Sequence, residues 1–221
     1  TEAIQNAEFS KKEADKAIEV ATSEREKAKN AQKQAEEAIQ KAEKSQQKLA
    51  LIDKEIETVQ QLVKLAEELR NENLITAIGA AYRLAALSSR VNDHNLKQAM
   101  LFVSMSQAYQ SLLAKEQNQK ANKQKEKIIK YQNLAEETMN ESLNYLNEEG
   151  AKISSSPQGL QIKVLVKRNQ AKLLSDKSKE VAINAYTEAY NTLKNHPNET
   201  NPFEQDRILT TEYIELVHRG L

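Results

Sequence analysis

The sequence of 221 residues contains no cysteine and no tryptophan, only 4 glycines and 3 prolines, and 5% aromatic residues. Sheet-rich folds need tight turns, which glycine and proline supply through positive or fixed φ angles. The scarcity of both residues argues against a sandwich, a barrel or a doubly wound α/β domain. We therefore expect an all-α fold.

The lack of cysteine excludes disulfides, thiolate metal sites and thiol nucleophiles. The chain begins with a charged, Ala-rich run, and no basic segment followed by an apolar one precedes it, so no signal peptide is visible. These features favour a cytoplasmic location. Because the chain starts at Thr1 and stops at Leu221 directly after an amphipathic stretch, we interpret it as a segment of a longer polypeptide.

No charge of one sign dominates, since 32 Lys and Arg residues balance 32 Asp and Glu residues. This balance argues against a dedicated binder of nucleic acid or of an anionic membrane. Residues 115–130 and 163–179 are nevertheless basic, and residues 136–149 are acidic. Aromatic residues are not interleaved with the lysines as stacking on bases requires. Complementary surfaces between helices or subunits, and hence protein partners, are the preferred interpretation.

Residues 1–70 carry the strongest periodic pattern in the chain. Alanine or a larger apolar residue occupies every seventh position from Ala7 to Val63, and the positions three further on are small or apolar apart from Glu24. This is the a and d pattern of a coiled coil. A helix of such length extends roughly 95–105 Å at 1.5 Å per residue. We expect a long coiled-coil arm.

The apolar seam of this arm changes from alanine to larger residues at Leu49. Because burial of apolar area stabilises association, the larger side chains are expected to hold a partner more firmly. Pairing within a chain, pairing between chains and a long solvated helix without a partner all fit the pattern, and the number of helices stays open. The expected partner-binding residues of the arm are Leu49, Ile52, Ile56, Val59 and Val63.

Residues 71–149 are expected to form a helical hairpin followed by a further amphipathic helix. Residues 71–73 interrupt the heptads, and a turn at residues 91–95 offers Asp93 or an asparagine as a helix cap. A turn this short predicts antiparallel helices. Residues 115–130 are interpreted as a solvated helix or a linker, and residues 150–160, with serine, proline and glycine, as a loop.

Residues 161–221 are expected to form a helix pair, with Ser178 as a cap, and a capping helix that starts near Asn201. The second helix of the pair has closely spaced small and aromatic residues followed by a proline: Ala182, Ile183, Tyr186, Ala189, Tyr190 and Pro197. This spacing resembles the second helix of a tetratricopeptide repeat, in which small residues let helices approach closely, and the resemblance covers roughly 34 residues. It implies antiparallel pairs with α-solenoid packing, and Tyr186 and Tyr190 on a partner-binding face.

The whole arrangement, an Ala-rich arm followed by such helix pairs, resembles the connecting region of large bacterial STAND-type signalling and defence proteins. In that family, helical segments link a nucleotide-binding switch to sensor or effector domains. The four glycines here are isolated, and no Gly-Lys-Ser/Thr sequence occurs, so the phosphate-binding loop of such a switch is missing. Any nucleotide binding would belong to other parts of the parent protein.

The sequence offers no catalytic, cofactor-binding or metal-binding residues and no small-molecule substrate. Its only Glu-x-x-His pair is Glu215 and His218, whereas a di-iron bundle needs two such pairs and two further glutamates. The expected function is therefore non-catalytic protein interaction or oligomerisation. Two alternatives remain: a nucleic-acid-associated helical scaffold, and a membrane-active, pore-forming-like protein with residues 75–87 as its insertion segment. That segment contains Arg83 and is shorter than a membrane span.

Overall fold

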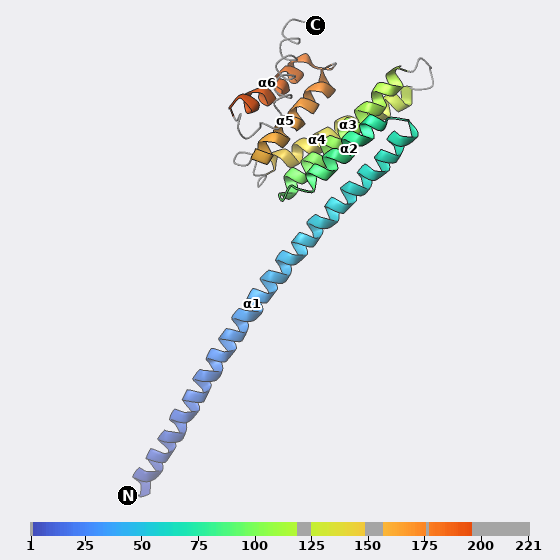
Figure 1. The fold of residues 1–221 in the computed structure, drawn as a ribbon. Helices are drawn as coiled ribbons and strands as arrows, with labels where there is room; N and C mark the ends of the chain where they lie inside the picture. Colours follow the sequence, from blue (N-terminus) through green and yellow to red (C-terminus); the bar gives the residue numbers. More distant parts are fainter. Residues whose placement is uncertain (1, 119–124, 149–156, 176, 196–221) are drawn as a thin grey trace. The chain divides into compact units, whose positions relative to one another are not determined.

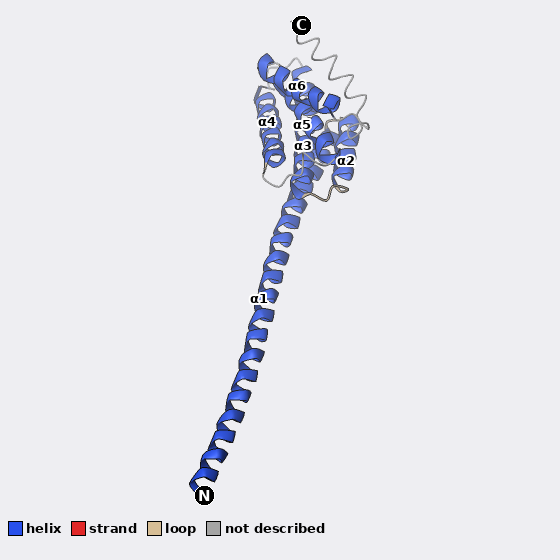
Figure 2. Ribbon diagram, turned by 90° about the vertical axis from the view of Figure 1, so that its left-hand side faces the viewer, coloured by secondary structure: helices blue, strands red, loops and turns tan. Residues whose placement is uncertain are grey.

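The computed structural model describes residues 2–118, 125–148, 157–175 and 177–195. These residues form helices joined by turns, and no strand occurs among them (Figures 1 and 2). The all-α prediction is confirmed. The chain divides into two compact units, residues 1–53 and residues 54–221. The helices are α1 (Glu2–Asn71), α2 (Ile75–Ser88), α3 (His94–Asn118), α4 (Lys125–Asn147), α5 (Pro157–Leu174) and α6 (Lys179–Asn195).

The first unit consists of the first part of α1. Its sequence is rich in Ala, Lys, Glu and Gln, which have high helix propensity, and the Glu24 carboxylate pairs with Lys27 at 3.0 Å. All side chains that the structure describes between residues 4 and 54 are exposed. The predicted long helix is confirmed, and nothing within its own unit covers its apolar residues.

Helix α1 ends where the heptads break. Asn73 has a positive φ of 59°, a conformation that asparagine tolerates better than most residues. Its N–H donates to the Arg70 carbonyl at 3.0 Å, and the Leu74 N–H donates to the Leu69 carbonyl at 2.8 Å. These two bonds form a Schellman motif, which satisfies the last carbonyls of α1 and turns the chain into α2.

The second unit contains the end of α1 and helices α2 to α6 (Figure 1), and its helices pack chiefly as α3 with α4, α5 with α6, and α2 with α3. Helices α1 and α3 run parallel, because Glu55 bonds to Lys97 and, further along both helices, Glu72 bonds to Lys115. Successive helices that each pack against their neighbours are consistent with the α-solenoid-like packing expected from the sequence.

Small residues let α3 and α4 approach closely. The Ser106 hydroxyl of α3 donates to the Ala135 carbonyl at 2.8 Å, and the Ser142 hydroxyl of α4 donates to the Ala99 carbonyl at 2.7 Å. The order of these partners shows that the two helices are antiparallel. All four residues are fully buried, so each hydroxyl needs the bond it makes.

Two large clusters form the core of the second unit. One joins α1, α2, α3 and α4 and contains Leu62, Leu65, Leu69, Ala81, Leu101, Met105, Ala108, Leu112 and Tyr131. The other joins α3, α4 and α5 with residues near α2, and contains Leu84, Val91, Leu96, Ala99, Met100, Val103, Met139, Leu146, Ile162 and Val166. Helix α3 contributes most to both clusters and is the central helix of the unit.

Two predicted helix caps are present in the structure, and one predicted loop is shorter than expected. Asp93 is confirmed as the cap of α3, since its Oδ1 accepts the Leu96 N–H at 3.0 Å. The Ser178 hydroxyl likewise accepts the Val181 N–H at 3.4 Å. The loop predicted over residues 150–160 is wrong at residues 157–160, because α5 begins at Pro157; proline's fixed φ suits the first turn of a helix.

The domain boundary also differs from the prediction. The sequence divided the chain into residues 1–70, 71–149, 150–160 and 161–221, whereas the compact units meet between Asp53 and Lys54. The reason is that the end of α1 supplies Leu62, Leu65 and Leu69 to the core of the second unit. The predicted Asn201 helix and Pro197 lie outside the described residues.

Candidate interaction surfaces

Five large apolar side chains of α1 are exposed and form what we call the α1 stripe. Their spacing of three and four residues places them on one face of the helix. All five were predicted as partner-binding residues from the heptad pattern. Their exposed fractions are 60% for Leu49, 48% for Ile52, 50% for Ile56, 42% for Val59 and 44% for Val63.

A second face of α1 packs against the helices of its own unit. Thr58, Leu62, Leu65 and Leu69 are buried, with Leu69 fully so. At about 100° per residue, the centre of this covered face lies about 130° around the helix from the centre of the stripe. The heptad pattern does not predict this second face, although the spacing of the three leucines could have revealed it.

Polar side chains attach the covered face of α1 to α3. The Glu55 carboxylate lies 2.9 Å from Nδ1 of His94 and 2.8 Å from Nζ of Lys97. Burial acts to raise the pKa of Glu55, but hydrogen bonds and charge from Lys97 and His94 outweigh it and hold that pKa below its usual range. The Thr58 hydroxyl continues the attachment by bonding to the Gln98 side chain at 3.0 Å.

At the other end of the same contact, Nζ of Lys115 lies 2.6 Å from the Glu72 carboxylate and 2.7 Å from the Glu72 carbonyl. The hydrogen bond from Lys115 holds the pKa of Glu72 below its usual range. Charged contacts therefore lie at both ends of the α1–α3 contact, with the leucines between them. This arrangement fixes which face of α1 is covered.

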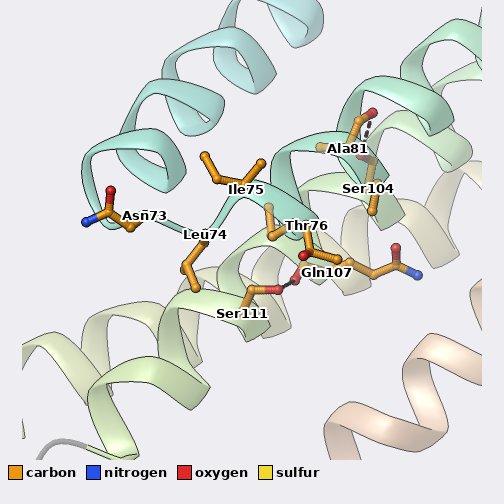
Figure 3. A pocket seen from close by; sticks show the side chains of 11 residues that line it. Asn73, Leu74, Ile75, Thr76, Ala81, Ser104, Gln107 and Ser111 are labelled. Atoms are coloured by element: carbon orange, nitrogen blue, oxygen red, sulfur yellow. Dashed lines mark hydrogen bonds between the residues drawn. The ribbon is translucent and has the colours of Figure 1, made fainter.

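A cleft of about 380 Å³ lies between the start of α2 and α3. Figure 3 shows Leu74, Ile75 and Thr76 on one side and Gln107 and Ser111 of α3 on the other. The Ser111 hydroxyl donates to the Gln107 carbonyl of its own helix at 3.0 Å. No lining residue is acidic, basic or histidine, so the cleft lacks the acid–base groups that catalysis uses.

The structure separates the two tyrosines that the tetratricopeptide resemblance placed on one binding face. Tyr186 is only 2% exposed and packs in a cluster with Ala171, Ala182 and Ala185. Its assignment as a partner-binding residue is therefore wrong: the small alanines leave a space that the ring fills. Tyr190 is half-buried on the same helix.

Within the described ranges, no group of three or more acidic or histidine residues is placed to hold a metal ion. In the same part of the chain, no helix has the length and apolar character that crossing a membrane requires. No known family model, no curated protein and no solved structure matches the chain.

Proposed function

We propose that this chain is a non-catalytic association module whose binding surface is the α1 stripe. The single observation that carries the proposal is the exposure of five large apolar side chains in the a and d positions of one helix. A coiled-coil seam is stable only when another helix covers it. The α1 helix has such a seam, and the other helices of the second unit cover a different face of it.

The energetics of α1 support this proposal. Most helical stability in proteins comes from packing of an apolar face rather than from propensity, and the described side chains of residues 4–54 are all exposed. Full burial of a valine, leucine or isoleucine side chain contributes about 1.5–3 kcal/mol. Because about half of each stripe side chain is still exposed, pairing would add roughly 1 kcal/mol per residue.

The charged segments support protein contacts over nucleic-acid binding. Lysines of the two basic segments pair with acidic residues of other helices: Lys127 with Glu116 at 3.4 Å and Lys167 with Glu188 at 3.0 Å. Lys115 and Lys177 do the same with Glu72 and Glu136. These four lysines of the basic segments thus pair with carboxylates of the same chain rather than remaining available for phosphate groups.

On the resemblance to the connecting regions of STAND-type proteins alone, we further propose that the module belongs to a larger bacterial signalling protein. The α1 stripe would there bring together the parts of the assembly on either side of it. A membrane-active role is a weaker proposal, because α2 buries Ala81 and Leu84, and insertion of residues 75–87 would break that packing.

The test is the mass of the full 221-residue chain in solution, measured by light scattering after gel filtration. We expect the wild-type chain to have a mass above the monomer value of 25.0 kDa. The triple variant Ile52→Gln, Ile56→Gln, Val59→Gln should have the monomer mass. Glutamine has higher helix propensity than isoleucine or valine, so the variant weakens the surface without weakening the helix.

A matched control replaces three comparably exposed apolar side chains that lie off the stripe: Tyr82, Ile129 and Val181, at 54%, 58% and 40% exposure. Substituting glutamine for all three should leave the mass unchanged. A wild-type chain that stays at the monomer mass throughout a concentration series would contradict the proposed function.

A further inference from the structure

We propose that the helix covering the α1 stripe is α1 of a second copy, parallel to the first and in the same register. This inference rests on the proposed function and names its partner. It is carried by three observations on α1: the order of large and small residues along the seam, the charges beside the seam, and the face that remains free.

The first observation is that large and small seam residues are segregated. From Ala7 to Ala42 the a positions are all alanine, and from Leu49 to Val63 they are leucine, isoleucine and valine. In a parallel pair in register, each layer meets its own copy, so alanine faces alanine and the stripe faces the stripe. The five half-exposed side chains of the stripe then cover one another.

An antiparallel pair with the same overlap places the stripe against the small residues. Ile56 would face Ala17, Val63 would face Ser10, and Leu49 would face Glu24. The stripe would then gain less apolar contact, and one glutamate would be held against a leucine. Because gain scales with the apolar area buried, the seam favours the parallel pair over the antiparallel pair with the same overlap.

The second observation is the charge beside the seam. In a parallel coiled coil, a residue at g faces the e residue five positions later in the partner. Lys48 then faces Asp53 of the second copy, a favourable pair, and no like charges meet. The pairs up to Lys48 are Asn6 with Lys11, Glu13 with Ile18, Val20 with Arg25, Lys27 with Gln32, Gln34 with Ile39, Lys41 with Gln46, and Lys48 with Asp53. The later g residues, Glu55 and Leu62, contact the second unit of their own chain instead.

The antiparallel arrangement gives less favourable charge pairs, because the g residues of one copy then face the g residues of the other. Full overlap brings Lys27 of one copy opposite Lys48 of the other, and like charges in such positions oppose pairing. The charges therefore favour the same arrangement as the seam residues. Both the seam residues and the charges beside them are compatible with α1 paired in register with itself. We therefore take the partner helix to be a second copy.

The third observation is that the free face leaves room for a helix. The stripe is centred about 130° around α1 from the face that packs on α3. With helix axes 8–10 Å apart at each contact, the partner axis would lie about 14–18 Å from the axis of α3. This exceeds the distance between packed helices, so the partner can occupy the stripe without displacing α3.

The experiment uses the natural absence of cysteine. A disulfide forms only between cysteines whose Cα atoms lie about 4.4–6.8 Å apart. In a parallel pair in register, a single cysteine at a seam position meets its own copy. We expect Ile52→Cys and Ala28→Cys, each in the full chain, to move most of the protein to twice the monomer mass on a non-reducing gel after mild oxidation.

The matched control is Lys33→Cys, at an exposed position opposite the seam, which should give at least tenfold less covalent dimer. The antiparallel arrangement predicts a different result: Ile52→Cys alone would not cross-link, but a mixture of Ile52→Cys and Ala21→Cys chains would. That result, together with stripe-dependent assembly in solution, would overturn this inference and leave the proposed function standing. A monomeric chain would overturn both.

Discussion

The two apolar faces of α1 have nearly the same composition but different partners. Leu62, Leu65 and Leu69 are buried in the core of the second unit, while Ile56, Val59 and Val63 on the neighbouring face are exposed. The covered face has charged and polar residues placed against α3, beginning with Glu55 and Thr58. The two faces therefore differ in their polar contacts to α3 rather than in the hydrophobicity of their large side chains.

The largest expected effect is the difference in unfolding free energy between a substitution on the covered face and one on the exposed face. Leu69→Ala removes a fully buried side chain and should lower the free energy of unfolding of the second unit by about 2–5 kcal/mol. Val63→Ala, on the exposed face, should cost well below 1 kcal/mol at concentrations where the chain is monomeric. Denaturant titration followed by circular dichroism measures both. Equal losses would show that the stripe is packed inside the chain.

How far the sequence predicted this arrangement depends on the kind of signal. The long helix, its end near Asn73 and the cap at Asp93 were predicted, because each depends on local residues and their backbone preferences. The heptad pattern also placed the five stripe residues on one face of the helix, and the structure leaves that face exposed. Their partner was not predictable, since alanine at a and d does not fix the number of helices.

The errors occurred where tertiary packing decides the outcome. One heptad pattern explained residues 1–70 so well that the second face of α1, with Leu62 and Leu65, was overlooked. Tyr186 was placed on a binding surface by resemblance, yet it packs among alanines in the core. In both cases the deciding factor was a helix distant in sequence, which periodicity within one helix does not report.

Two alanines sharpen the comparison between the units. Ala135 is fully buried, and its carbonyl accepts the Ser106 hydroxyl between α3 and α4. Ala135→Leu should therefore overpack the contact and cost about 1–3 kcal/mol of unfolding free energy. Ala35→Leu adds apolar surface to the exposed seam and should instead raise the temperature at which the α1 helix melts, in a concentration-dependent manner. Destabilisation by both variants would mean that α1 is already closely packed there.

Acid should weaken the packing of the covered face of α1 against α3 before it affects the exposed stripe. The pKa of Glu55 is lower in the folded protein than its ordinary value of 4.5, so the folded state binds that proton less tightly than the unfolded state. The stabilising contribution is present above about pH 4.5 and is lost as the pH falls through the folded pKa. Glu55→Gln should flatten this part of the stability profile.

The measurement for Glu55 is unfolding free energy against pH, compared with Glu57→Gln as the control. Glu57 is exposed on the same helix, so its loss should leave the acid-dependent decrease in place. If Glu55→Gln retains the full decrease below pH 4.5, the contact with Lys97 and His94 contributes nothing to the attachment of α1, and the leucines alone select the covered face.

The smallest expected effect concerns Glu24, the one charged residue of the seam. In the parallel pair, Glu24 faces its own copy, and each carboxylate is partly balanced by Lys27 of the same helix at 3.0 Å. Exposed like-charge contacts cost a few tenths of a kcal/mol, so Glu24→Ala should strengthen dimerisation by about two- to threefold. Sedimentation equilibrium at low and high salt measures the gain, which should shrink as salt screens the repulsion. Weaker dimerisation would show that a cation of the second copy, of which Arg25 beside the same layer lies nearest, contributes more than the repulsion costs.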